Sequence, residues 1–492
     1  MSRLVSGLYF LLHYGPLALY SSEIFETISL VAKLIRSVNT SIPWADIAIR
    51  VYYVMAEQRG ARLRGENPVA PATSANVPTS LISPLMHYCG LAVHIAYEAS
   101  RTDAQRLLAL QGYTLVLAGT VQSGSVHPFF LACKGKKEVV VIFPGTRGIG
   151  DLQINMNAFD MVIDGSKDFS THKGVGHVAQ RLVGELRDPL LRLQKSGFSN
   201  IVVVGHSLGA AIGSIFTHLL RDCVKDIVCY GFGCPPCVST ALGRSLQDRV
   251  TNVFLRDDVV CRASVRNVES LLATLVDPST SARIKEYLKQ DWTNLRKNWK
   301  FFFLLQSRPW VEVSGIEYAA SSNMKSDESW WARLRNRIGR PRSTVSEPQI
   351  KDDRMVIPGK IVYMYPQNGI GTWEAFFINA CDPRLMAIDI QTEMVSDHSG
   401  ESYFRALLQV GVGTRASARP VLANTCACCG HDFLWNSVLK GEPHIWLAKH
   451  VCRKCGATTC DACSGHKRGV PELGLIWPVR HCDRCWLTVS RL

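Results

Sequence analysis

The chain has 492 residues, of which 47% are hydrophobic and 20% are charged, and its net charge is +14. This length predicts roughly two to four domains with sizeable cores, and the composition excludes a disordered, collagen-like or long coiled-coil protein. The basic balance favours anionic partners such as a phospholipid surface, whereas no motif supports nucleic acid binding.

The N-terminal region, residues 1–80, reads as apolar and helical and ends in a loop rich in Pro, Ser and Ala. Its first segment, from Leu4 to Tyr20, is apolar but is interrupted by a His, a Gly and a Pro. A membrane span needs about 20 apolar residues, and no small-residue cleavage site marks a signal peptide. The segment therefore predicts a packed helix or one that lies on a membrane surface, with a membrane span or a signal peptide as the alternative.

Strands and helices alternate from residue 81 to about residue 412. The run Val-Val-Val-Ile-Phe at 139–143 is apolar throughout, which is typical of a central strand that is buried on both faces. This alternation predicts an α/β architecture with a largely parallel sheet. We expect helices over 81–110, 176–196 and 210–220, and strands near 112–119, 127–135, 138–143, 201–207, 227–232 and 252–258.

The motif Gly-His-Ser-Leu-Gly at residues 205–209 stands between a buried strand and a helix-forming run. A serine on such a sharp turn projects out of the sheet, and the flanking glycines let the backbone turn tightly. The helix that follows presents N–H groups to an oxyanion. Ser207 is therefore the candidate nucleophile of a hydrolase.

Together with Phe-Pro-Gly-Thr at residues 143–146, this motif resembles class 3 lipases, and most of all the branch that contains the sn-1 diacylglycerol lipases. The resemblance extends over residues 81–412 and implies an α/β-hydrolase fold of the class 3 lipase type. It implies Thr146 and Leu208 as the oxyanion donors, although Pro144 stands where the family has arginine. It also implies that Asp151 braces the loop and that His172 begins a structural turn.

A nucleophilic serine needs a base, and the base needs an orienting carboxylate. Asp258 begins Asp-Val-Val-Cys-Arg, which is similar to the family pattern D-x-V-P-R and makes it the expected orienter, with Asp257 as the alternative. His398 follows a predicted strand late in the domain and is the expected base, because the order along the chain is Ser, Asp, His. Its rivals are three histidines that precede Ser207 or lie on the next helix, namely His172, His177 and His218.

Between Asp258 and His398 lies a basic insertion at about 280–350, with thirteen Lys or Arg, seven Asp or Glu and five tryptophans. Mixed basic and aromatic residues suit a segment that covers the site and touches an anionic lipid interface. The alternative is a solvated basic loop without a role.

Nine of the 17 cysteines lie between Cys426 and Cys485, mostly as C-x2-C pairs. Four such pairs predict two structural zinc ions held by eight thiolates, and Cys428 is left over. Residues 413–425 read as a linker, and 426–492 form a module too small to fold well without metal. The ligands are Cys426, Cys429, Cys452, Cys455, Cys460, Cys463, Cys482 and Cys485.

The segment Lys-His-Val-Cys-Arg-Lys-Cys-Gly at 449–456 resembles the basic motif of FYVE zinc fingers, and Arg-His-Cys at 480–482 resembles their late motif. The resemblance implies cross-braced zinc ions, with cysteine pairs one and three on one ion and pairs two and four on the other. It also implies phosphatidylinositol 3-phosphate on endosomes as a partner. The expected headgroup-binding residues are Lys449, His450, Arg453 and Arg480.

The sequence thus predicts a serine lipase that hydrolyses acylglycerol esters, diacylglycerol first, at the cytoplasmic face of endosomal membranes. A phospholipase or monoacylglycerol lipase of the same fold is the first alternative. A phosphoinositide-binding scaffold with an inactive hydrolase domain is the second, and the even cysteine pairs disfavour a RING-type ubiquitin ligase. The triad chemistry needs no metal ion, and a role for calcium is left open.

Overall fold

The computed structural model describes residues 22–39, 41–63, 76–98, 100–120, 124–146, 160–163, 165, 168–289, 355–367, 372–412, 423, 425–430, 450–460, 463–470 and 475–489. Four of the sequence predictions lie outside these residues: the apolar segment 4–20, nearly all of the basic insertion, Asp151 and Lys449.

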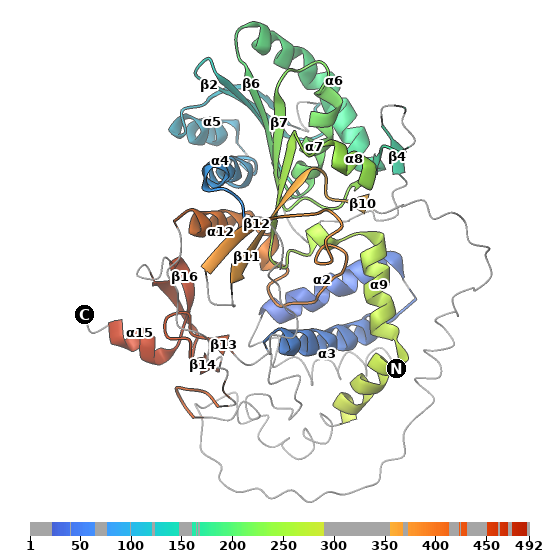
Figure 1. Ribbon diagram of the computed structural model, residues 1–492, viewed down its shortest axis with the longest axis vertical. Helices are drawn as coiled ribbons and strands as arrows, with labels where there is room; N and C mark the ends of the chain where they lie inside the picture. The colour runs from blue at the N-terminus through green and yellow to red at the C-terminus, as the bar shows by residue number, and fades with distance from the viewer. Residues whose placement is uncertain are drawn as a thin grey trace, which may run out of the picture.

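An eight-stranded sheet forms the centre of the molecule (Figure 1). Its five inner strands pair in parallel and are flanked by antiparallel strands at both edges, which confirms the predicted largely parallel sheet. In spatial order the strands are β1 (Thr114–Gly119), β2 (Phe129–Lys134), β3 (Glu138–Phe143), β6 (Asn200–His206), β7 (Ile227–Phe232), β9 (Val250–Leu255), β11 (Lys360–Gln367) and β12 (Thr372–Ile378).

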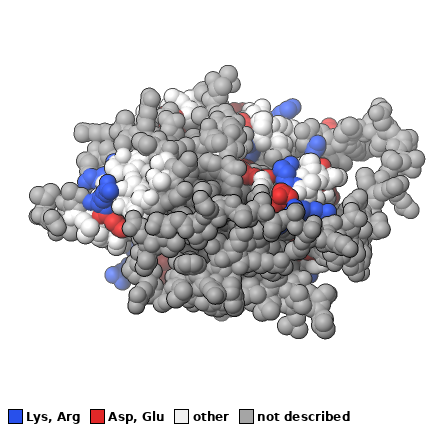
Figure 2. All heavy atoms as spheres, turned by 90° about the horizontal axis from the view of Figure 1, so that it is seen from below, with Lys and Arg blue, Asp and Glu red and all other residues white. Residues whose placement is uncertain are grey.

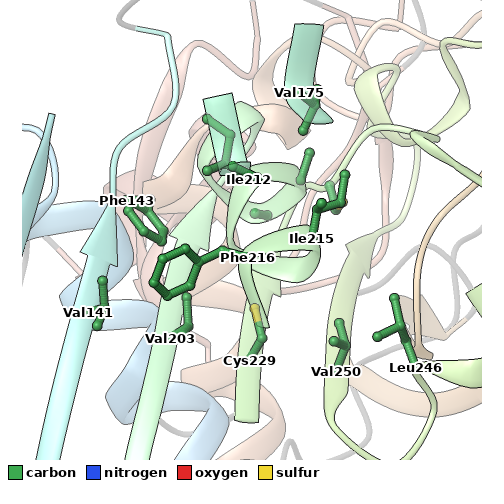
Figure 3. Packing of buried hydrophobic residues seen from close by; sticks show 14 of the residues in the cluster. Val141, Phe143, Val175, Val203, Ile212, Ile215, Phe216, Cys229, Leu246 and Val250 are labelled. Carbon is green, nitrogen blue, oxygen red and sulfur yellow. The ribbon is translucent and has the colours of Figure 1, made fainter. Parts of the chain in front are cut away.

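Helices cover both faces of this sheet because alternate residues of each inner strand point to opposite sides. Val141 and Phe143 pack against Phe216 and the helices on one face (Figure 3), whereas Val140 belongs to the core of the other face. The first face carries α6 (Lys173–Lys195), α7 (Leu208–Leu220) and α8 (Thr240–Ser245), and the second carries α4 (Thr79–Gly90), a π-helical turn (Leu91–Ile95), α5 (Arg101–Leu110) and α12 (Gly400–Val412).

The helix expected over 81–110 is interrupted. The chain leaves the helical path after the π-helical turn, and Ser100 starts α5 as its N-cap. The Ser100 hydroxyl oxygen accepts the N–H groups of Thr102 and Asp103 at 3.1 and 3.3 Å, which favours a new helix start over a continuous helix.

A helical hairpin, α2 (Ser22–Val38) and α3 (Trp44–Leu63), packs beside α9 (Val265–Val276) below the sheet (Figure 1). Its core includes Ile388, Ile390 and Met394, which precede the candidate base His398 in the chain. Among the helices that the structure describes, none combines the length and apolar character that crossing a bilayer requires.

Two smaller parts complete the fold. A four-stranded sheet has the order β10 (Met355–Val356), β8 (Val238–Ser239), β5 (Ser170–His172) and β4 (Asp160–Val162). In its described residues the C-terminal module has two hairpins and a helix, and its strand β16 packs against α12 (Figure 1). The elements are β13 (His450–Val451), β14 (Thr458–Thr459), β15 (His466–Val470), β16 (Leu475–His481) and α15 (Asp483–Val489).

Candidate active site and metal centres

Ser207 forms the turn between β6 and α7, with φ 57° and ψ −126°. Such a positive φ is strained for a residue with a side chain, and it persists here because the strand and helix on either side fix the turn. A Cβ at Gly205 would collide with the carbonyl of Gly209, and a Cβ at Gly209 would collide with the carbonyl of Phe143. Both glycines are therefore needed for the close approach of helix to sheet.

A chain of hydrogen bonds joins Ser207, His398 and Asp258. The Nε2 atom of His398 lies 2.9 Å from Ser207 Oγ, and its Nδ1 atom lies 2.9 Å from Asp258 Oδ2 and 3.1 Å from Oδ1. Because a carboxylate only accepts, Nδ1 carries the proton and Nε2 accepts from the serine hydroxyl. All three side chains are buried.

Four donors surround the Asp258 carboxylate. Besides His398, the Tyr403 hydroxyl donates to Oδ2 at 2.6 Å and the Val260 N–H donates to Oδ1 at 2.8 Å. The Cys261 thiol also donates to Oδ2, at 3.6 Å. Burial opposes the charged form, but the interactions with His398, Tyr403 and Val260 outweigh it and hold the pKa of Asp258 below its usual value. Asp258 is therefore charged and rigidly oriented.

The alternative carboxylate points elsewhere. Asp257 accepts two hydrogen bonds from Arg62, at 2.5 and 3.0 Å, and lies 3.5 Å from Arg262. Of the rival histidines, His172 and His177 lie where β5 meets α6, and His218 lies in the last turn of α7 beside Arg221 at 3.0 Å. The structure thus brings Asp258 and His398, and not these alternatives, to Ser207.

The segment after β3 runs directly beside Ser207. A Cβ at Gly145 would lie 2.8 Å from the Ser207 Cβ, so the backbone that leads to Thr146 borders the candidate nucleophile. Leu208 is the first residue of α7, where backbone N–H groups are unpaired and the helix dipole is positive. Both expected oxyanion donors therefore lie next to the serine in the chain or in space.

Sequence reasoning missed a hydrogen-bonded pair behind the site, His206 and Tyr97. The Gly145 N–H donates to the Tyr97 hydroxyl at 3.2 Å, the hydroxyl donates to His206 Nδ1 at 2.6 Å, and His206 Nε2 donates to the His398 carbonyl at 2.9 Å. Burial, together with the nearby His398, lowers the pKa of His206 to about 3, so its ring is neutral. Nothing in the sequence around Tyr97 signals this contact.

Eight cysteines form two tetrads in the C-terminal module. Within each tetrad the sulfur atoms lie within 4.8 Å of one another, with 4.0 Å between Cys429 and Cys460 and 3.8 Å between Cys455 and Cys482. Tetrahedral zinc with Zn–S bonds of about 2.3 Å needs sulfur atoms about 3.8 Å apart, so both tetrads fit the ion. The sets are Cys426, Cys429, Cys460 and Cys463, and Cys452, Cys455, Cys482 and Cys485, which is the grouping that cross-braced zinc ions would need.

Three of the four expected headgroup-binding residues lie in described parts of the module. His450 lies in β13, and the Arg453 N–H donates to the carbonyl of Arg480 in β16 at 2.9 Å. Seen from below, basic side chains are visible on the side where Figure 1 places this module and also on the opposite side (Figure 2). The Arg453 side chain is half-buried, and this burial, reinforced by the nearby positive charge of Arg256, lowers its pKa to about 10.

Two family models match this chain. The model for lipase (class 3) matches residues 140–268, which include Ser207 and Asp258, and the model for the FYVE zinc finger matches residues 420–491. Diacylglycerol lipase-beta of Mus musculus is 29% identical over 152 residues, which is 29% of this chain and 23% of that protein. WD repeat and FYVE domain-containing protein 2 of Homo sapiens is 36% identical over 64 residues, or 13% of this chain and 16% of that protein.

Solved lipase structures are similar to part of the chain. The lipase from Rhizopus microsporus var. chinensis has a TM-score of 0.34 at 18% identity and covers 40% of this chain and 74% of its own. Rhizomucor miehei triacylglyceride lipase has a TM-score of 0.33 at 17% identity, and the match covers 38% of this chain and 76% of that lipase. The chain spans less than a quarter of the length of the two curated relatives above. The sheet topology and the cysteine tetrads agree with these matches: the chain combines a domain of α/β-hydrolase fold, similar to class 3 lipases over residues 140–268, with a C-terminal module that matches the FYVE zinc finger over residues 420–491.

Proposed function

We propose that this protein is a serine lipase that hydrolyses acylglycerol esters, with diacylglycerol favoured, at the surface of endosomal membranes. The observation that carries the proposal is the continuous hydrogen-bonded chain from Ser207 through His398 to Asp258. The similarity to a protein named diacylglycerol lipase-beta supports the substrate class.

In the proposed mechanism, His398 Nε2 takes the proton of Ser207 as Oγ attacks the ester carbonyl. The backbone N–H groups of Thr146 and Leu208 receive the negative charge on the carbonyl oxygen. Asp258 stabilises the imidazolium, and His398 returns the proton to the leaving alcohol. Water then attacks the acyl-serine by the same route, which releases the fatty acid and restores the enzyme.

The finger would bring the lipase to its substrate. The match to FYVE zinc fingers supports phosphatidylinositol 3-phosphate as the lipid that is bound. We propose that its headgroup is contacted by Lys449, His450, Arg453 and Arg480. The two zinc ions would hold these residues in place and would take no part in ester hydrolysis.

The test is hydrolysis of vesicles of diacylglycerol, triacylglycerol, monoacylglycerol or phosphatidylcholine by purified protein, beside Ser207→Ala. We expect diacylglycerol to be hydrolysed fastest and the variant to lose the activity. Preference for phosphatidylcholine or monoacylglycerol would replace the proposed substrate with one of the alternatives. Absence of all activity, without labelling of Ser207 by a fluorophosphonate probe, would favour a lipid-binding scaffold instead.

A matched pair of variants tests the orienting carboxylate. Asp258→Asn should lower kcat by about 10³-fold or more, because the amide favours the wrong histidine tautomer. Asp257→Asn keeps the Asp258–His398 pair and should leave more activity than Asp258→Asn. The reverse order would move the orienting role to Asp257.

A further inference from the structure

Two loops bring the candidate orienter and base together. The first follows β9 and carries Arg256, Asp257 and Asp258, and the second precedes α12 and carries Asp397 and His398. Each loop therefore places a further carboxylate immediately before its triad residue. Neither Asp257 nor Asp397 has a role in the proposed mechanism. Both carboxylates are nevertheless buried, with exposed fractions of only 1% and 2%.

Arg256 binds one loop to the other. Its guanidinium donates to both oxygens of Asp397, from Nε at 2.9 Å and from Nη2 at 2.5 Å, and the Asp257 N–H donates to Asp397 Oδ2 at 3.0 Å. Arg256 also has φ 35°, a conformation that favours glycine. An arginine in this position carries backbone strain, which the bidentate ion pair offsets.

Arg62, a residue of helix α3, contacts both of these loops as well. It lies in the last turn of α3, and it donates to both oxygens of Asp257 at 2.5 and 3.0 Å. Its Nη2 also contacts Asp389 on the second loop. Burial opposes the charge of Asp257, but Arg62 and Arg262 hold its pKa below the usual value, so the pair is ionic at neutral pH.

We propose that Arg62 and Arg256, with their partners Asp257 and Asp397, are positioning residues. They hold the side chains of Asp258 and His398 at the distance and orientation that their hydrogen bond requires. This proposal rests on the proposed function. The reason is geometric: each carboxylate of the cluster is the direct chain neighbour of one triad residue, so a shift in either ion pair displaces the Asp258–His398 hydrogen bond. The helical hairpin α2–α3 is then part of the catalytic unit.

The variants Arg62→Gln, Arg62→Lys and Arg256→Gln test this. We expect the two glutamine variants to lower kcat at least about tenfold with KM within about twofold, because misplaced catalytic groups act on the chemical step. Arg62→Lys keeps the charge without the bidentate geometry and should recover part of kcat. Rates are normalised to the fraction of protein that a fluorophosphonate labels, so that unfolded molecules are not counted.

Arg221→Gln is the matched control. Arg221 binds Asp222 at 3.3 Å at the C-terminal end of α7, which is the end away from Ser207, so kcat should stay at the wild-type value. If Arg62→Gln does not fold, Asp389→Asn removes one acceptor of Arg62 and should lower kcat in the same direction. Glutamine variants with wild-type kcat per labelled site would overturn the proposal, as would a loss equal to that of Arg221→Gln.

The same series separates this inference from the proposed function. If the wild-type protein neither hydrolyses esters nor is labelled at Ser207, the proposed function fails and takes the positioning role with it. If the wild type is active and loses activity on Ser207→Ala but not on Arg62→Gln or Arg256→Gln, only the positioning role fails.

Discussion

We predict that the hydroxyl of Tyr403 stabilises the fold around Asp258 more than it assists the chemistry. This buried group donates to Asp258 Oδ2 at 2.6 Å and accepts the Leu255 N–H at 3.2 Å. Tyr403→Phe removes one hydrogen bond to a charged group and leaves a buried N–H unpaired. The free energy of unfolding should fall by about 2–4 kcal/mol, which lowers the melting temperature by about 4–16 °C for a domain of this size.

The effect of Tyr403→Phe on kcat should be smaller. Asp258 keeps its bonds to His398 and Val260, which maintain its orientation. A carboxylate with one donor fewer is more basic, and it favours the imidazolium of the transition state at least as well. We therefore expect kcat per labelled site to stay within about tenfold of the wild type.

Tyr363→Phe is the control for this measurement. Within the described residues the buried Tyr363 hydroxyl has no hydrogen-bond partner, so its removal should leave the melting temperature unchanged or raise it. Thermal unfolding and kcat on a soluble ester are measured for both variants. A fall in kcat of about 10³-fold at an unchanged melting temperature in Tyr403→Phe would refute the reasoning, since it would mean that the hydroxyl acts in the transition state.

Four further predictions concern the rest of the molecule. The pKa of His206 is about 3 in the folded protein and 6.5 in the unfolded chain, so only the unfolded chain gains a proton between these values. The free energy of unfolding should therefore fall as the pH drops from 6.5 towards 3, by at most about 1.4 kcal/mol per pH unit. If the melting temperature of His206→Gln falls with pH as steeply as that of the wild type, this prediction is wrong. Chelation should release two zinc ions per chain and unfold the finger, as followed by a zinc indicator and near-ultraviolet circular dichroism, and Cys428→Ser should leave both ions bound. Arg453→Ala should weaken binding to vesicles with phosphatidylinositol 3-phosphate at least about tenfold, unlike Arg187→Ala, which changes an exposed residue of α6. No gain over phosphatidylserine in the wild type would reject the headgroup specificity. Deletion of residues 285–350 should raise turnover of soluble esters if the insertion covers the site, and equal or lower turnover in a folded variant would count against it.

The candidate nucleophile and the zinc ligands could be predicted because their signals are local. Ser207 stands in a five-residue motif between a buried strand and a helix, and the cysteines form pairs two residues apart. The choice of Asp258 over Asp257 depended on the resemblance to a family pattern, because the two carboxylates are neighbours and local pattern cannot say which faces a histidine. The fold places Asp257 on Arg62 instead.

The supporting residues could not be predicted because their contacts are distant in the chain. Arg62 meets Asp257 across 195 residues, and Tyr97 meets His206 across 109. Single-sequence patterns report periodicity and short motifs, and neither of these pairs produces one. The break before α5 was missed for a related reason, since a serine at an N-cap is recognisable only once the helix start is known.

The packing of α3 on the catalytic loops bears on how the protein can be dissected. A recombinant fragment that begins at residue 81, where the sequence suggests that the hydrolase starts, would lack Arg59 and Arg62. It would also leave Glu393, which accepts from Arg59 at 3.2 Å, and Asp257 without these cations. A fragment that retains residues from Ser22 onwards keeps the hairpin, so the choice of its first residue decides whether a purified hydrolase domain reports on the native protein.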